Sequence, residues 1–377
     1  MQAGVFKGTR MTAHLFSPIT IGGLDFPNRI AVAPMCQYSA VDGAASDWHL
    51  QHWMMLAMTG AGMVTVEMTD VERRGRITHG CHGLYSDDNE AAAKRTLDAA
   101  RRVAAPGTKF GVQLAHAGRK ASCARPWEGG KPLQPGQDPW QTVSASAVPY
   151  GDGWHVPHAL ESDEIEAMVG KFVAAAERAR RVGFDFIEIH SAHGYLLNQF
   201  LSPLSNRRTD EWGGSLEDRM RLPLAIIAAV GAAVPELMLG ARLSVTEWVD
   251  GGLSVEDGVA IASAYRAAGV AYVCSSSGGN SPLQKVPVGP GYQVHLAEAV
   301  RHGAGVVSRA VGMIQDPHQA DQIVRSGRAD MVALGRAFLA DPRWVWRAGA
   351  ALGHEVWRVP QYARAGEIAP RPASAAA

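Results

Sequence analysis

The chain has 377 residues, of which 36 are basic and 36 are acidic, and 47% are hydrophobic. This is the composition of an ordinary globular protein that can bury a sizeable core. Zero net charge argues against a nucleic-acid partner, and no apolar run approaches the roughly 20 residues that span a bilayer.

The two ends of the chain differ in composition from the rest. Residues 1–13 contain Lys7 and Arg10 but lack the apolar stretch of a secretory signal, so we expect a flexible N-terminal extension. The last residues, 366–377, read GEIAPRPASAAA and are predicted to be a disordered tail. The folded domain is therefore expected to cover residues 14–365.

Short apolar runs alternate with helical patterns between these ends. The predicted strands cover residues 29–34, 62–67, 109–114, 184–190, 237–242, 271–275, 305–310 and 330–334. Each strand is followed by a predicted helix, and these helices cover residues 48–59, 88–104, 162–182, 215–233, 254–268, 293–302, 316–326 and 337–350. Capping residues support three of them: Ser162, and Ser215 and Ser254, which are each followed three residues later by an aspartate.

Eight strand–helix units predict an α/β fold, the (β/α)₈ TIM barrel with long βα loops. The alternative is a doubly wound sheet, but the first strand is followed by APMCQYSA instead of a glycine-rich dinucleotide turn. A barrel needs roughly 250 residues, so the surplus must form insertions. The largest are expected at 118–160 and 276–292, and loops of this kind usually shape or cover a site.

The cysteines Cys36, Cys81, Cys123 and Cys274 are far apart and form no CxxC pair. Neither a disulfide framework nor a zinc knuckle is expected from this spacing. A cytoplasmic location is therefore the default expectation.

The fourth predicted strand leads into the segment EIHSAHGYLL, residues 188–197, which places His190, His193 and Tyr195 within six residues. A barrel collects its active site at the carboxyl ends of its strands. Two imidazoles and a phenol there form a hydrogen-bonding and proton-donating cluster. Any one of these histidines alone would more often be a buried structural residue, so the cluster carries the functional hypothesis.

The other strand ends supply amide, guanidinium and thiol groups, with almost no carboxylates. A glycosidase would need paired carboxylates, and a metal-dependent hydrolase would need more acidic or histidine ligands, so no metal site is expected. The groups present suit a flat, hydrogen-bonding and partly anionic cofactor. Gly312 and Gly335 follow the seventh and eighth strands, where barrels commonly bind phosphate, with Arg336 as a counter-charge.

Several long motifs resemble the old yellow enzyme family of FMN-dependent ene-reductases, and in particular its bacterial thermophilic-like branch, which includes xenobiotic reductases. The matching segments are LFSPITIGGLDFPNRI at 15–30, APMCQYSA at 33–40, GVQLAHAGRKAS at 111–122, GFDFIEIHSAHGYLLNQFLSPLSNRRTDEWGGSLEDR at 183–219, PGYQV at 290–294 and GRADMVALGRAFLADP at 327–342. The resemblance covers residues 15 to about 364. It implies an NAD(P)H-dependent flavin oxidoreductase that acts on α,β-unsaturated carbonyl compounds.

The resemblance also implies roles for individual residues. His190 and His193 are expected to hold the substrate carbonyl oxygen, and Tyr195 to protonate its α carbon from the face opposite the hydride. FMN is expected to lie against Pro34, Met35, Cys36, Met68, Gln113, Arg242, Val311, Gly312, Gly335 and Arg336. NADPH or NADH would be the hydride donor. Tyr38 is expected to line the substrate pocket.

The chain departs from its relatives at two of these positions. Met68 stands where alanine is common, and Val311 stands where some xenobiotic reductases carry tryptophan, so substrate stacking from that side is in doubt. In the matching branch, an arginine at the place of Arg364 reaches into the neighbouring subunit's active site. The resemblance thus implies a homodimer or higher homo-oligomer, with Arg364 near the partner's substrate.

Four alternatives remain open at this point. A nitro-compound or nitrate-ester reductase could use the same scaffold, and a dienoyl-CoA reductase is a close relative. The dienoyl-CoA relatives carry a cysteine-rich iron–sulfur segment after the barrel, but this sequence has no cysteine after Cys274. A metal-dependent barrel hydrolase that uses His190 and His193 as ligands is an alternative of another class, as is a non-catalytic flavin-binding barrel.

Overall fold

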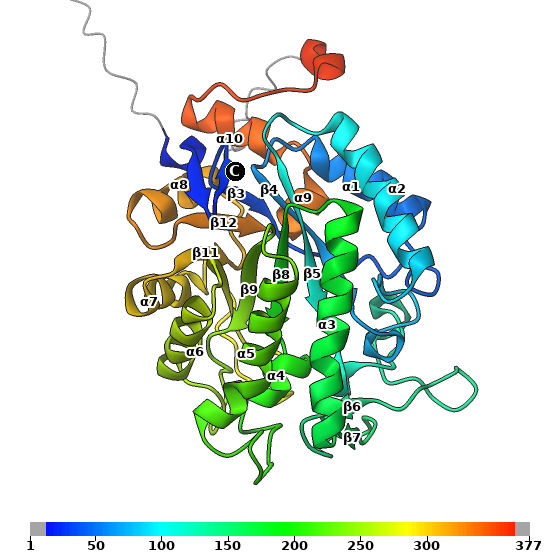
Figure 1. Ribbon diagram of the computed structural model, residues 1–377. Coiled ribbons are helices and arrows are strands. Elements are labelled where there is room, and N and C mark those ends of the chain that lie inside the picture. Colours follow the sequence, from blue (N-terminus) through cyan, green and yellow to red (C-terminus); the bar gives the residue numbers. More distant parts are fainter. Residues whose placement is uncertain (1–12, 366–377) are drawn as a thin grey trace, which may run out of the picture.

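The computed structural model describes residues 13–365, and in it helices surround a closed barrel of strands (Figure 1). Eight parallel strands form the barrel in the spatial order β10-β11-β12-β3-β4-β5-β8-β9, and β9 pairs with β10 to close it. These strands are β3 (Ile30–Val32), β4 (Met63–Asp70), β5 (Lys109–Ala115), β8 (Phe186–Ser191), β9 (Met238–Ser244), β10 (Tyr272–Ser276), β11 (Val307–Val311) and β12 (Met331–Leu334). The predicted (β/α)₈ barrel and its eight strands are confirmed.

The helices that cover the barrel follow the predicted order. They are α1 (Asp47–Ala57), α2 (Asp87–Val103), α3 (Ser162–Val182), α5 (Leu216–Ala233), α6 (Val255–Ala267), α7 (Val294–Ala304), α8 (Pro317–Arg325), α9 (Arg336–Ala340) and α10 (Trp344–Leu352). The caps of α5 and α6 are confirmed, because the hydroxyls of Ser215 and Ser254 each accept a backbone N–H at 3.1 Å. The predicted cap at Ser162 was wrong, because Ser162 is the first residue of α3 and Glu161 is its N-cap.

The last predicted helix, over residues 337–350, was wrong as a single element, because α9 and α10 are separate helices. Pro342 lies between them and has no N–H to continue the helical hydrogen bonds. The Asp341 side chain instead accepts the backbone N–H of Arg343 at 2.9 Å.

A hairpin at the amino-terminal end of the barrel was not predicted. It consists of β1 (Ile19–Ile21) and β2 (Leu24–Phe26) and follows the short helix η1 (His14–Phe16). Ile21 and Phe26 are buried in one apolar cluster with barrel residues, including Phe186 and Tyr272. The hairpin thus closes the end of the barrel opposite the predicted site.

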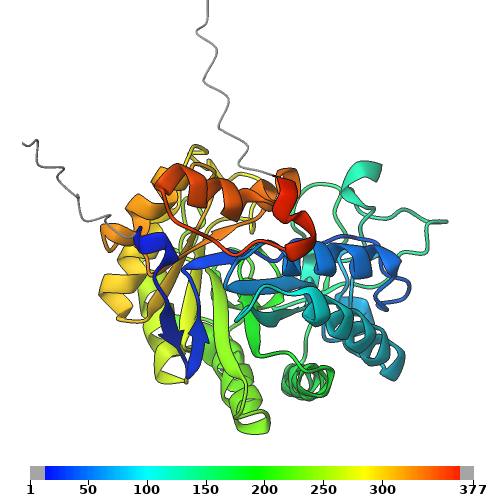
Figure 2. The same cartoon turned by 90° about the horizontal axis from the view of Figure 1, so that it is seen from above.

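The two ends of the described chain lie side by side, as Figure 2 shows for the dark blue and the orange-to-red segments. Phe16 of η1 stacks on His354, which follows α10, with their ring centroids 4.5 Å apart. The chain then continues into the short helix η5 (Pro360–Ala365). The predicted tail and all but the last residue of the predicted N-terminal extension lie outside the described residues, so both stay predictions.

The long loop 118–160 forms small elements of its own at the other end of the barrel. It contains η3 (Gly118–Lys120), η4 (Pro126–Glu128) and a two-stranded parallel sheet of β6 (Val143–Ser144) and β7 (His158–Ala159). The helix α4 (Leu196–Leu201) follows β8 and lies at the same end (Figure 1). None of the helices between residues 13 and 365 is long and apolar enough to cross a membrane.

Candidate active site

Eight of the predicted site residues line one cavity of about 300 Å³ at the carboxyl ends of the barrel strands. They come from the loops after β3, β8, β11 and β12, from the strands β9 and β11, and from the first residue of α9. These residues are Pro34, Met35, His193, Arg242, Val311, Gly312, Gly335 and Arg336. The fold therefore brings together positions that lie up to about 300 residues apart in the chain.

Three further predicted residues pack together close to this cavity. Cys36 and Tyr195 contact a small buried cluster that contains Met68. The loop that carries Cys36 is anchored by Glu67, whose carboxylate accepts the Gln37 backbone N–H at 2.8 Å. Burial, with a smaller contribution from Cys81, raises the pKa of the Cys36 thiol well above its usual value. Cys36 is thus a protonated hydrogen-bond donor and not a thiolate at neutral pH.

Tyr38 lies next to Cys36 at the outer side of this loop. Burial and the neighbouring Cys36 raise the pKa of the Tyr38 phenol, so it remains protonated. Its ring also meets the exposed Trp127 of η4 edge-on, with ring centroids 5.9 Å apart. Tyr38 is therefore placed between the predicted cofactor loop and the long insertion.

His190 and His193 face one another through their ring nitrogens. His190 Nε2 and His193 Nδ1 are 3.3 Å apart, and the backbone N–H of Ala192 donates to His190 Nδ1 at 3.1 Å. Because His190 Nδ1 accepts this bond, the neutral ring carries its hydrogen on Nε2. Burial, then the charge of Arg242, lowers the pKa of both histidines, so both are neutral.

Ser276, at the end of β10, contacts the ring nitrogen of His193 that faces away from His190. This residue was not predicted from the sequence to be part of the site. Its Oγ lies 2.7 Å from His193 Nε2 and also lines the cavity. His190 Nε2–H donates to His193 Nδ1, so the neutral ring of His193 carries its hydrogen on Nε2 and donates it to Ser276 Oγ. A substrate oxygen that enters between the rings would accept from His190, and also from His193 once the Ser276 hydroxyl donates to Nε2 and the hydrogen of His193 moves to Nδ1. No motif around Ser276 could have identified this role.

The backbone around His193 adopts unusual conformations that fix this geometry. His193 has a φ of 60°, and its N–H donates to Ser244 Oγ at 2.9 Å. The next residue must be small, because a Cβ at Gly194 would lie 2.2 Å from the Gly279 carbonyl oxygen. Tyr38 and Met313 also have positive φ values, of 51° and 49°. Backbone strain of this kind gathers at functional sites.

Tyr195 lies beside the histidines. Its ring centroid is 5.1 Å from that of His190, and the two rings are almost perpendicular. It immediately precedes α4, and its carbonyl accepts the Gln199 N–H at 2.8 Å, so the first turn of that helix holds it. Burial, then Cys36, raises the pKa of the Tyr195 phenol well above its usual value. The phenol therefore keeps its proton throughout the working range of pH.

The hydrogen bonding of Arg242 indicates whether the cavity fits an anionic cofactor. Its Nε is buried and has no hydrogen-bond partner among residues 13–365. A buried guanidinium donor without a partner is costly, so the site lacks an acceptor that a bound group would supply. Arg336 adds a second positive charge to the cavity wall. Hydrogen-bonding, negatively charged FMN fits this donor set.

Gln113 lies inside the barrel and does not line the cavity. Its amide donates to Glu188 Oε1 at 2.8 Å, and Tyr272 donates to the other oxygen, Oε2, at 2.8 Å. The fully buried Arg309 forms an ion pair with the same carboxylate. The sequence reasoning missed this network, which fills the barrel below the cavity and holds Gln113 in one orientation.

Arg364 lies in η5 and is exposed. It does not line the cavity, so the fold of one chain does not bring it to the other predicted site residues. In η5, Tyr362 packs on Arg343, whose guanidinium lies 5.0 Å from the ring centroid. The predicted contact with a neighbouring subunit stays a prediction.

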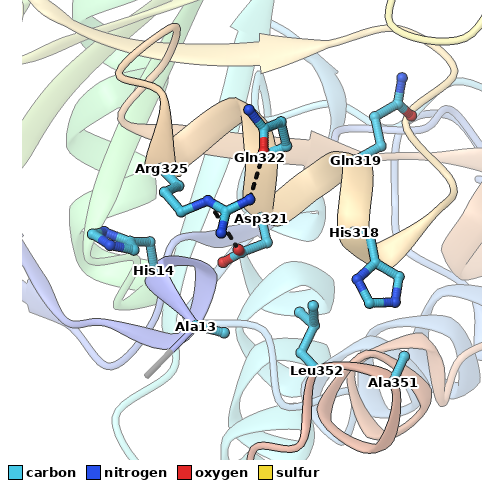
Figure 3. Close-up of a pocket in the computed structure, with 9 residues that line it drawn as sticks. All are labelled: Ala13, His14, His318, Gln319, Asp321, Gln322, Arg325, Ala351 and Leu352. Carbon is cyan, nitrogen blue, oxygen red and sulfur yellow. Dashed lines mark hydrogen bonds and ion pairs between the residues drawn. The ribbon is translucent and has the colours of Figure 1, made fainter. Parts of the chain in front are cut away.

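A larger cavity, of about 780 Å³, lies outside the barrel between η1, α8 and α10 (Figure 3). His14 and His318 lie on opposite sides of it, and Arg325 reaches toward Asp321 and Gln322. None of the predicted site residues lines this cavity. Three of its polar side chains, Asp321, Gln322 and Arg325, pair with one another. Because the predicted site residues gather at the smaller cavity instead, we place the chemistry there. Among residues 13–365, no group of three or more His, Cys, Asp or Glu side chains could hold a metal ion.

Comparison with known proteins gives a family match over almost the whole described chain. The profile of the NADH:flavin oxidoreductase / NADH oxidase family matches residues 14–355. An NADPH dehydrogenase from Geobacillus sp. (strain WCH70) is 40% identical over 356 residues, which cover 94% of this chain and 99% of the relative.

Solved structures give the same picture. Morphinone reductase in complex with tetrahydroNAD is similar with a TM-score of 0.72 and 29% identity, over 91% of this chain and 92% of that one. A 2-naphthoyl-CoA reductase complex has a TM-score of 0.80 and 25% identity over 91% of this chain. This chain spans only 53% of the reductase's length.

Proposed function

The chain belongs to the NADH:flavin oxidoreductase / NADH oxidase family, and we propose that it reduces the C=C bond of α,β-unsaturated carbonyl compounds. The predictions of an old yellow enzyme relative, of an NAD(P)H-dependent flavin oxidoreductase and of an FMN cofactor are confirmed. One observation carries the finer proposal. Two neutral imidazoles, of which His193 lines the cavity, stand together with a protonated phenol.

When bound in this cavity and reduced by NADPH or NADH, FMN would supply the hydride for the β carbon of the substrate. Arg242, Gly312, Gly335 and Arg336 would hold its anionic parts, and the loop of Pro34, Met35 and Cys36, with Met68 and Gln113, would support the ring system. His190 and His193 then hold the carbonyl oxygen. Negative charge develops on this oxygen in the transition state. Hydrogen bonds that become stronger as this charge grows lower the activation barrier of the reduction.

Tyr195 completes the reduction by giving its proton to the α carbon. The phenol is suited to this role because its raised pKa keeps the proton in place until a carbanion-like centre needs it. Its ring stands beside His190, so the proton donor and the carbonyl donors act on neighbouring atoms of one substrate.

The experiment that tests the proposal is an anaerobic reaction in two steps. The enzyme is first reduced with NADPH and then mixed with 2-cyclohexenone, a nitroaromatic compound or a nitrate ester. Rapid flavin reoxidation and formation of cyclohexanone are expected with the enone. Reoxidation only by the nitro compound or the nitrate ester would contradict the proposal and favour the xenobiotic reductase alternative. The comparisons give no support to the hydrolase alternative.

Cys36 is expected to tune the cofactor more than to hold it. We expect Cys36→Ala to retain FMN but to change its reduction potential by about 20 mV, the two-electron equivalent of one hydrogen bond of roughly 1 kcal/mol. Spectroelectrochemical titration measures the shift. Cys36→Ser keeps a donor and serves as the matched control. An unchanged potential in the alanine variant would contradict the role.

We further propose that Arg364 acts in a neighbouring subunit. It is exposed and does not line the cavity of its own chain, so we place its role at the substrate site of a second copy. Two-fold symmetry would make the exchange of arginines between two subunits reciprocal.

Truncation after Val359 is therefore expected to raise the KM for both enone and NAD(P)H several-fold without removing FMN. Arg364→Ala should reproduce much of this effect, whereas Arg180→Ala, which removes another exposed arginine, should not. Steady-state kinetics and light scattering measure the outcome. A monomeric protein, or unchanged KM values after truncation, would overturn the shared site.

A further inference from the structure

Lys120 is a partly buried lysine to which the proposed reaction gives no role. It ends η3 after β5, and its ammonium donates to two backbone carbonyls, those of His193 and Gly279, each at 2.8 Å. These two carbonyls belong to the loops after β8 and β10. Lys120 therefore ties together three of the loops that surround the cavity.

The ammonium of Lys120 also lies between two aromatic rings. Its Nζ is 5.2 Å from the ring centroid of Tyr195 and 4.8 Å from that of Tyr150, which belongs to the long insertion. A cation over an aromatic face is attracted to the electron-rich ring. This attraction becomes stronger when the phenol loses its proton, because the phenolate charge spreads over the same ring.

We propose that Lys120 is a positioning residue of the proton-transfer step, which stabilises the phenolate that Tyr195 leaves behind, and that its two bonds to backbone carbonyls hold its ammonium in place for this role. In this step the O–H bond of Tyr195 breaks, a C–H bond forms at the α carbon of the substrate, and the electron pair stays on the phenol oxygen. Water returns a proton to the phenolate afterwards. The inference rests on the proposed function, because it requires Tyr195 to be the proton donor.

The charges around Lys120 predict a pH dependence of this effect. Burial, then Arg119, lowers the pKa of Lys120 to about 8, while Cys123 acts weakly in the opposite direction. The other titratable groups that face it do not change charge near this pH. The pKa values of the Tyr195, Tyr150 and Cys123 side chains are raised, and those of His190 and His193 are lowered. The ammonium therefore prevails below pH 8 and is lost above it.

The first test is a double-mutant cycle on the reoxidation of reduced flavin by 2-cyclohexenone at pH 7. Lys120→Met is expected to slow this step about tenfold, within the range of coupling between neighbouring residues, and to slow reduction by NADPH much less, because that half-reaction forms no phenolate. In a Tyr195→Phe background, the same substitution should have almost no further effect, since no phenolate forms there. Equal slowing in both backgrounds would overturn the inference.

The pH profile of the unmodified enzyme gives a test that no folding defect can obscure. Reoxidation by the enone should slow as the pH rises through about 8, and Lys120→Arg should remove this decline, because arginine keeps its charge. Arg119→Met should move the decline to higher pH, since Arg119 is one of the groups that lower the pKa of Lys120. A profile without this decline in the unmodified enzyme would contradict the inference.

Direct titration of the Lys120 ammonium by NMR tests the inference without measuring enzyme activity. NMR of the enzyme carrying ¹³C-labelled lysine should show one resonance that titrates near pH 8 and is missing from Lys120→Met. A Lys120 resonance that titrates at the usual lysine pH would contradict the inference.

If Tyr195→Phe by itself leaves enone reduction unchanged, the proposed function fails. If it slows the step but Lys120→Met does not, only the role of Lys120 fails.

Discussion

Tyr195→Phe is expected to slow reoxidation of the reduced flavin by an enone about 10²–10⁴-fold, the usual contribution of a general acid. Reduction of the flavin by NAD(P)H should change little, because that half-reaction transfers a hydride and needs no proton from the phenol. The expectation rests on the raised pKa of the buried Tyr195 and on its position beside His190. Anaerobic stopped-flow absorbance measures the two half-reactions separately.

Tyr38→Phe provides the matched control for this substitution. Tyr38 is also a phenol near Cys36 with a raised pKa, but it lies at the outer side of the loop, next to Trp127. Its loss should alter substrate binding more than proton transfer. Equal damage to both half-reactions in Tyr195→Phe would show that the substitution disturbs the site as a whole and would remove the assignment as proton donor.

The barrel could be predicted because each of its strands is a short apolar run followed by an amphipathic or well-capped helix. The elements that escaped prediction lack these signals. All six residues of α4 are buried, so the helix has no polar face from which a helical period could be read. The hairpin β1–β2 has three residues in each strand, too few for an alternating pattern to stand out.

The candidate site was predictable to the extent that it depends on strand ends and long motifs. Strand ends converge in a barrel, so residues as distant as Pro34, Arg242 and Arg336 could be expected to meet. Groups that act through tertiary contacts were not predictable. Ser276 matters only because its hydroxyl lies 2.7 Å from His193, and Lys120 only because its ammonium meets two carbonyls from other loops.

The hydrogen-bond partner of Gln113 could not be predicted from the sequence either. Sequence alone places an amide at the end of a strand, but its orientation depends on Glu188, which in turn is held by Arg309 from β11. A buried charge needs such a partner, yet which strand supplies it follows from the closure of the barrel and not from any local pattern.

Replacing both His190 and His193 by alanine is expected to abolish most enone turnover and to weaken the binding of phenolic ligands. Each donor to a developing oxyanion contributes about 2.7–4 kcal/mol, so loss of two should cost at least 10³-fold in turnover. Phenolates imitate the oxyanion, and bound p-hydroxybenzaldehyde should give a long-wavelength charge-transfer band with oxidised FMN. Titration of this band measures the affinity directly.

The matched control replaces each histidine by asparagine, whose amide keeps an N–H donor. Because burial and Arg242 keep the pKa of both histidines low, the pair binds a phenolate as neutral donors, and acidification to pH 6 should not strengthen that binding through them. The asparagine variants should therefore retain part of the affinity that the alanine variants lose. If the double alanine variant keeps both the band and its affinity, the oxyanion is held elsewhere in the cavity, and the carbonyl-binding role of this pair is wrong.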